Sequence, residues 1–317
     1  SVGPDHANTI DALNGLAFVY FTRGEFDRAD APLREALRAA RTHGDDELKR
    51  VSDLTANLHV ARQQNGDYEE ALTLLQESAA LSARLPDYDP DDNAIVQGNM
   101  AVLLSDMGRH EEALQMRRDA LAHWQSAYPP GSPMSVNALM GYGLQLHEVG
   151  RPEEGLPYIQ ESVDLYRSIA ESESEPYQLV GALISYGTVL TAADRTTQAA
   201  EVLGEAQRLV EASLPPSTSL SARLASAQAG LFQARGEWDA AVRAADRAVE
   251  TFAAAGRADA DGVGWTLATK ARALIEGGQR DEALAALRRA RAIFSDRYGD
   301  AHPAVSTMDS LRAVARS

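Results

Sequence analysis

The sequence has 317 residues, of which 44% are hydrophobic and 24% are charged, a balance that predicts a folded chain with a packed core. Its formal net charge of -16 would repel a phosphate backbone, which argues against nucleic-acid binding. The chain has no cysteine, so it cannot form disulfides, iron–sulfur clusters or Cys-ligated zinc sites.

The beginning of the chain gives no targeting signal. It starts at Ser1 without a methionine, a charged segment or an apolar run, so we expect a piece of a longer protein without a secretory signal. The longest uncharged stretch, 176–193, is too short and too polar to predict a membrane span. We therefore expect a cytoplasmic protein that does not enter a membrane.

A short pattern, Gly-x-x-x-x-Ala, recurs along the chain. Copies start at residues 24, 66, 108, 150, 236 and 278, the copy at 150 ends in glycine instead of alanine, and a related copy starts at Asp194. The starts are 42 residues apart, except for one interval of 44 residues before Asp194. A constant period of this length indicates a repeat architecture.

Each repeat carries one apolar helical pattern before the turn residue and a second one after it, which predicts a hairpin of two helices. The turn residue needs a positive φ, which glycine adopts readily and Asp194 tolerates. The acidic residues that follow it favour the start of the second helix. We expect one array over 1–317, with repeats at approximately 7–44, 46–85, 91–128, 133–171, 176–213, 218–255 and 259–297.

Small residues recur at three positions of the repeat, which we call the small-residue columns. The column five residues after the turn residue contains Ala29, Ala71, Ala113, Gly155, Ala199, Ala241 and Ala283. The column seven residues further on contains Ala36, Ser78, Ala120, Ser162, Ala206, Ala248 and Ala290. The column seven residues before the turn residue contains Ala17, His59, Ala101, Gly143, Gly187, Ala229 and Ala271. Because helices approach closely only where side chains are short, these columns predict the contact seams of the hairpins.

With these columns and turn glycines, the chain resembles a tetratricopeptide-repeat (TPR) protein. The 42-residue period resembles the kinesin-light-chain type, which occurs in bacterial signalling proteins, and the stretches 3–6, 31–33 and 298–305 support this subtype. The resemblance implies an all-α fold, namely a right-handed α-α superhelical solenoid of seven hairpins. It also implies a C-terminal capping helix at 303–315.

In proteins of this family the first helices of the repeats line a concave groove that binds a peptide, a helix or a partner domain. The resemblance therefore implies partner-binding residues at the groove-facing positions. They are Asn14, Phe18, Asn57, Asn99, Met140, Leu144, His147, Ile184, Thr188, Arg223 and Arg272. Other positions that count as groove-facing include Glu148, Ser185, Ser226, Trp265 and Thr269.

The groove positions also indicate what kind of segment would bind. Asn57 and Asn99 stand where the family often uses asparagine to hold a peptide backbone. The positions beside them carry no lysine or arginine, which argues against a carboxylate clamp at that place. The centre of the groove is mainly apolar, so we expect an apolar or amphipathic partner segment. Equally, these apolar residues could pack within a tight superhelix and bind nothing.

The sequence contains no catalytic or metal-binding motif. No two of the seven histidines stand four residues apart, the only lysines are Lys49 and Lys270 and neither follows a glycine, and no G-x-S-x-G is present. Paired carboxylates recur at helix starts, which indicates a role in helix stability and not in acid–base chemistry. We expect no enzyme, no metal and no small-molecule cofactor.

Together these patterns predict a protein–protein interaction scaffold, as a regulatory or C-terminal part of a bacterial signalling protein. One alternative is a sensor whose repeats close around a short pheromone peptide. A weaker alternative is an enzyme.

Overall fold

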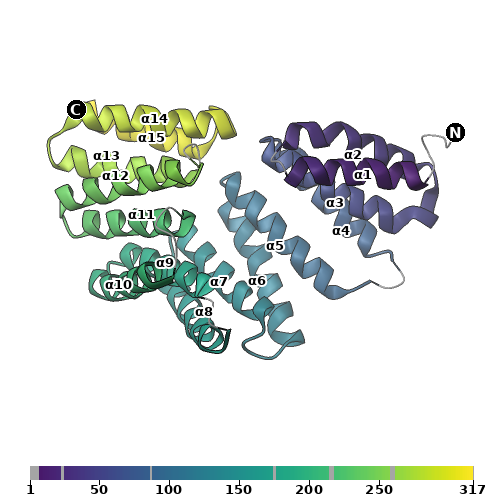
Figure 1. The fold of residues 1–317 in the computed structure, drawn as a ribbon, viewed down its shortest axis with the longest axis horizontal. Coiled ribbons are helices and arrows are strands. Elements are labelled where there is room, and N and C mark those ends of the chain that lie inside the picture. The colour runs from purple at the N-terminus through teal and green to yellow at the C-terminus, as the bar shows by residue number, and fades with distance from the viewer. Residues whose placement is uncertain are drawn as a thin grey trace. The chain divides into compact units, whose positions relative to one another are not determined.

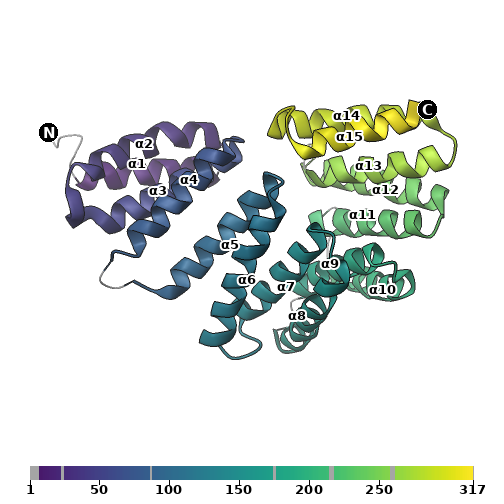
Figure 2. The same cartoon turned by 180° about the vertical axis from the view of Figure 1, so that it is seen from behind.

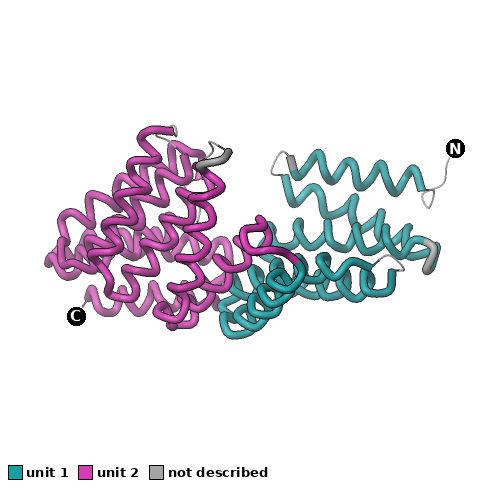
Figure 3. The backbone as a smooth tube through the Cα atoms, turned by 90° about the horizontal axis from the view of Figure 1, so that it is seen from below, with its two compact units in different colours: residues 1–127 teal, residues 128–317 magenta. Residues whose placement is uncertain are grey.

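The computed structural model of the chain describes residues 7–22, 25–85, 88–173, 176–213, 218–257 and 261–316. These residues form fifteen α-helices and one short 3-10 turn, with no strand among them (Figure 1). The chain divides into two compact units, residues 1–127 and residues 128–317 (Figure 3).

The first unit contains three helical hairpins. Their helices are α1 (Ala7–Thr22) with α2 (Phe26–Arg41), α3 (Leu48–Gln64) with α4 (Tyr68–Ser82), and α5 (Pro90–Asp106) with α6 (His110–Ala127). The 3-10 turn η1 (Gly44–Glu47) joins the first two hairpins. Within this unit each helix packs against the next one in the chain.

The second unit contains four hairpins and a final helix, which Figure 2 shows from behind. Its helices are α7 (Pro133–Glu148), α8 (Pro152–Glu173), α9 (Tyr177–Ala192), α10 (Thr196–Ser213), α11 (Ser219–Ala234), α12 (Trp238–Ala254), α13 (Asp261–Glu276), α14 (Arg280–Tyr298) and α15 (Pro303–Arg316). Seven hairpins and a capping helix are thus present, as the sequence predicts. The cap α15 packs on α14 and α13 and buries Met308 and Val305 against the same core as Phe294.

The turns confirm the prediction of positive φ. Gly66, Gly108 and Gly150 have φ of 84°, 75° and 78°, and Asp194 is the one described non-glycine residue with positive φ, at 60°. Around Gly66 the amide of Asp67 donates to the carbonyl of Arg62 at 2.9 Å, and the amide of Gly66 donates to that of Gln63 at 3.1 Å. These two bonds define a Schellman motif, which satisfies the last carbonyls of the first helix. The turn residue Gly24 lies outside the described residues.

The small-residue columns form the contact seams of the hairpins, since all their members are buried. In the fourth hairpin, glycines of α7 and α8 let the two helices approach closely. A methyl group on Gly143 would lie 2.9 Å from the carbonyl oxygen of Gly155 and 2.5 Å from Cγ1 of Ile159. Only glycine fits there, because even one carbon atom would overlap the facing backbone.

His59 is the exception in its column, and the structure accommodates it as a buried residue. Its side chain is 7% exposed and its Nδ1 contacts the carbonyl oxygen of Ala56. Burial lowers the pKa of the imidazole, which keeps the ring neutral at pH 7. This environment gives His59 a structural role inside the hairpin.

Candidate functional site

The first helices of the four hairpins in the second unit line one continuous face. Helix α9 contacts both α7 and α11, and α11 contacts α13. This face contains a hollow of about 430 Å³, which we call the first-helix hollow. Its lining residues are Leu144, His147, Glu148, Ile184, Ser185, Thr188, Thr191, Arg223, Ser226, Ala227, Gly230, Phe252, Gly262, Trp265 and Thr269.

The floor of the hollow is apolar. Ile184 is buried in the core of the unit, and Leu144 and Ala227 pack against that core while remaining partly exposed. Trp265 is 47% exposed, and its ring lies 4.9 Å from the ring centre of Phe294 on α14. The core thus supports an indole that keeps much of its own surface accessible, which is how aromatic anchors of protein interfaces are often arranged.

The threonine hydroxyls around the floor donate to carbonyls of the helices that carry them. Thr188 donates to the carbonyl of Ile184 at 2.9 Å, and Thr191 donates to that of Gly187 at 2.8 Å. Their protons are therefore occupied, whereas the oxygen lone pairs stay available as acceptors. Among the described residues, no hydroxyl of this hollow bonds to His147, so the hydrogen bonds of a Ser–His catalytic pair are not formed here.

Arg223 on α11 is the cation of the hollow. Its guanidinium makes no hydrogen bond and no ion pair with another described residue. The side chain keeps contact with solvent, but the surrounding helices remove part of its hydration, and this desolvation lowers the pKa of the guanidinium from its ordinary value. Arginine nevertheless stays charged at neutral pH. The other ionisable residues of the lining are His147 and Glu148, at the α7 side.

The structure brings five of the predicted partner-binding residues together. They line the same hollow and are Leu144, His147, Ile184, Thr188 and Arg223. Met140 lies one helical turn before Leu144 and packs against the same core. Arg272 is exposed on α13, close to one turn after Thr269, and is not part of the lining.

The remaining four predicted residues belong to the first unit. The amide of Asn57 donates to the side-chain oxygen of Asn14 at 2.9 Å, so these two residues already bond to each other across α1 and α3. Asn14 also lines a separate hollow of about 410 Å³ with charged neighbours such as Asp53 and Arg50. Phe18 is 67% exposed on α1, and Asn99 is exposed on α5.

Sequence reasoning missed some of the lining. Thr191 follows Ile184 by seven residues and Ala227 follows Arg223 by four, so helical spacing alone could have placed both on this face. Phe252 comes from the second helix α12, and counting positions on first helices cannot find it.

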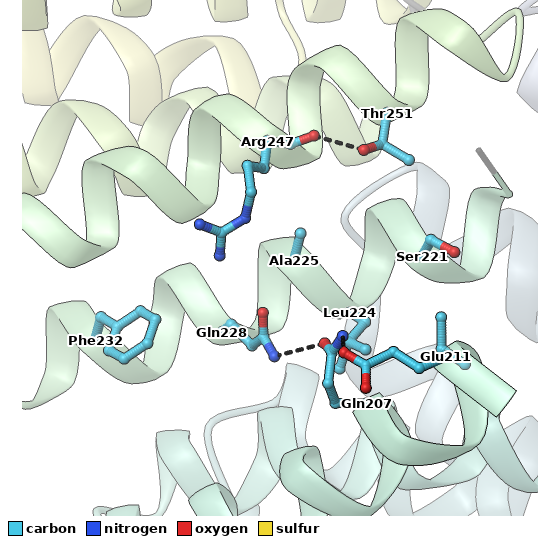
Figure 4. Close-up of a pocket in the computed structure, with 10 residues that line it drawn as sticks. Gln207, Glu211, Ser221, Leu224, Ala225, Gln228, Phe232, Arg247 and Thr251 are labelled. Atoms are coloured by element: carbon cyan, nitrogen blue, oxygen red, sulfur yellow. Dashed lines mark hydrogen bonds between the residues drawn. The ribbon is translucent and has the colours of Figure 1, made fainter. Parts of the chain in front are cut away.

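A larger hollow, of about 750 Å³, lies between α10, α11 and α12 (Figure 4). Gln228 on α11 donates to Gln207 on α10 at 3.1 Å, and Gln207 donates to Glu211 at 2.6 Å. Arg247 extends from α12 on the other side of this hollow (Figure 4). No pattern in the sequence indicated an opening between the second helices α10 and α12.

Over the described ranges, no three or more histidine, aspartate and glutamate side chains lie close enough to hold a metal ion. None of the helices in those ranges combines the length and the apolar character required to cross a bilayer.

Family comparisons match three parts of the chain, residues 9–46, 51–126 and 264–289, each to a model of the tetratricopeptide repeat. No curated protein has a significantly similar sequence.

Solved structures with the same fold cover nearly the whole chain. A tetratricopeptide repeat protein from Parabacteroides merdae ATCC 43184 is 13% identical, with a TM-score of 0.64 over 98% of this chain and 100% of that one. The apo form of RapI is 14% identical, with a TM-score of 0.74 over 90% of this chain and 98% of that one. A Rap protein complexed with Competence and Sporulation Factor is 12% identical, with a TM-score of 0.56 over 98% of both chains. At these identities the similarity establishes a shared fold.

Proposed function

Because this chain is a tetratricopeptide-repeat protein, we propose that it is an interaction scaffold that binds an apolar or amphipathic segment of a partner protein in the first-helix hollow. The observation that carries this proposal is the exposed indole of Trp265 beside the apolar floor of Ile184 and Leu144. A soluble chain gains nothing by leaving such a surface in water, whereas a partner helix or strand would cover it.

The proposal assigns binding to this hollow and no catalysis. The threonine hydroxyls of the lining donate to helix carbonyls, and its few ionisable groups are those of His147, Glu148 and Arg223. We further propose that the protein is the regulatory or C-terminal part of a bacterial signalling protein and acts in the cytoplasm. The support for this setting is the 42-residue period, which resembles repeats of such proteins.

Affinity capture with matched variants tests the binding proposal. Thr188→Glu adds a charge to the hollow, whereas Thr197→Glu adds the same charge at an exposed position of α10 outside it. A partner recovered by the wild type and by Thr197→Glu should be lost with Thr188→Glu. Titration calorimetry with the purified partner should then show at least a tenfold weaker affinity for Thr188→Glu alone. Equal affinities of the partner for both variants would show that the hollow is not part of the binding surface.

A sensor of a short peptide is the second candidate. It is favoured by the fold shared with the Rap protein that is complexed with Competence and Sporulation Factor. A sensor should be stabilised by a peptide of about ten residues or fewer, because a ligand that binds only the folded state raises the melting temperature. A scaffold for a folded domain should show no such response to short peptides, and a thermal-shift screen with short peptides separates the two candidates.

A further inference from the structure

Arg223 and Trp265 occupy equivalent positions in successive hairpins. Each stands thirteen residues before its turn residue, Gly236 or Gly278, and Gly181 stands at the same distance before Asp194. Helices α9, α11 and α13 pack in this order. Arg223 on α11 therefore lies between Gly181 on α9, which has no side chain, and the exposed indole of Trp265 on α13. A methyl group on Gly181 would meet only Leu220, at 3.8 Å. Arg223 therefore stands between an open position on α9 and an aromatic residue on α13.

The charge of Arg223 is unmatched among the described residues, although acidic residues outnumber basic ones by 46 to 30 in the sequence. Several arginines of the same unit pair with carboxylates. Arg167 bonds Glu205 at 2.8 Å, and Arg195 bonds Glu153. Arg223 has no such partner in the part of the chain that the structure describes, and the fold has already removed part of its water. A partly desolvated cation without a partner attracts an anion more strongly than a fully hydrated one, because less water must be displaced when the anion binds.

The surroundings favour an anion with one charge. Arg223 is the single arginine of the lining, which has no lysine, and Glu148 lines the same hollow. A group with two negative charges would leave one of them unmatched in a chain whose formal net charge is already -16. A carboxylate matches one guanidinium in charge and can accept two parallel hydrogen bonds from it.

We propose that the first-helix hollow recognises a peptide segment in which an aspartate or glutamate stands beside an aromatic or aliphatic residue. The acidic side chain binds Arg223, and the neighbouring apolar side chain covers Trp265. This inference rests on the proposed function, and it adds the chemistry by which the hollow selects its partner.

Fluorine NMR with peptide pools tests the inference. The protein is labelled with 5-fluorotryptophan, and the resonance of Trp265 is identified by its loss in Trp265→Phe. The probes are acetylated and amidated nonapeptides with randomised flanks and a fixed centre, which is Glu-Leu in one pool, Gln-Leu in the second and Glu-Ser in the third. Blocked ends and flanks without aspartate or glutamate ensure that only the fixed glutamate supplies a carboxylate.

We expect the Glu-Leu pool to shift the Trp265 resonance with an affinity about tenfold higher than that of the Gln-Leu pool, since a hydrogen bond to a charged group contributes at least this factor. The Glu-Ser pool should also bind more weakly, because serine buries less apolar surface against Trp265 than leucine does. Arg223→Gln should abolish the difference between the Glu-Leu and Gln-Leu pools. The matched control Arg243→Gln removes the same charge from an exposed position of α12 outside the hollow and should preserve the difference.

Two results would overturn the inference, and only one of them would also contradict the proposed function. If the Glu-Leu and Gln-Leu pools shift Trp265 with equal affinity, the hollow binds peptides without selecting a carboxylate, and the proposed function stands. If no pool shifts Trp265 at millimolar concentration, the inference and the proposed peptide binding both fail.

Discussion

Arg117 shows how a single residue can depart from the repeat. It stands nine residues after its turn residue, at a position where the other six hairpins bury an apolar side chain. Those side chains are Leu33, Leu75, Ile159, Leu203, Ala245 and Leu287. The Nε of Arg117 is buried without a hydrogen-bond partner among the described residues, and desolvation lowers the pKa of its guanidinium. A donor in this condition costs stability, because its hydration is lost and no bond replaces it.

Arg117→Leu should therefore stabilise the protein by about 1 kcal/mol, since it removes an unsatisfied buried donor and restores the side chain used in the other repeats. Urea denaturation followed by circular dichroism measures the change. Arg118→Leu, at an exposed position of the same helix, is the control and should change the free energy of unfolding by less than about 0.5 kcal/mol. A destabilised Arg117→Leu would mean that the guanidinium has a favourable role at this position.

Replacing the methyl group of Ala113 by a larger side chain tests how closely the two helices of a hairpin approach each other. It is fully buried in the seam between α5 and α6, so Ala113→Leu should force the two helices apart and cost about 1–3 kcal/mol. Ala122→Leu places the same side chain on the exposed side of α6 and should be nearly neutral. If denaturation gives the two variants the same stability, the seam is not tightly packed.

At the scale of the element, the turn residue decides where each first helix ends. Six described turn residues have positive φ, and one of them is Asp194. Asp194 shows that the backbone conformation is required even where the glycine is absent, because aspartate is one of the few residues that tolerate it. The constant turn holds the two helices of a hairpin in the register that buries all three small-residue columns.

Substitutions at two glycines distinguish the effect of backbone conformation on stability from the effect of packing. A Cβ added to Gly150 or to Gly230 would meet nothing within 4 Å, but Gly150 has φ of 78° whereas Gly230 lies inside α11. Gly150→Ala should destabilise the protein by about 1–2 kcal/mol, through the strain of the left-handed conformation. Gly230→Ala should stabilise it by about 0.5–1 kcal/mol, through helix propensity. Thermal denaturation that shows the same sign for both variants would refute this explanation of the turn.

At the scale of the whole molecule, the period of the sequence accounts for most of the fold and for part of the candidate site. Every hairpin has the same register, because the sequence repeats with a constant period. Counting residues therefore predicts the turns at Gly66 and Asp194 and the shared lining of Leu144, Ile184 and Arg223. Local spacing is enough for these features, because each hairpin repeats the same backbone geometry.

Other features could not be read from the period. The bond between Asn14 and Asn57, the contribution of Phe252 to the first-helix hollow and the opening between α10 and α12 all depend on how neighbouring hairpins are spaced and rotated. Side chains from several helices determine that geometry together, and no single position of the repeat encodes it.

Site-specific photo-crosslinking tests the central claim, that the face of first helices in the second unit binds the partner. p-Benzoylphenylalanine replaces Trp265 in the hollow, and in a second variant it replaces the exposed Thr197 on α10. Irradiation of cells that make the full protein should yield one defined adduct with the probe at Trp265 and none with the probe at Thr197. An adduct of the same partner at Thr197, with none at Trp265, would contradict the account.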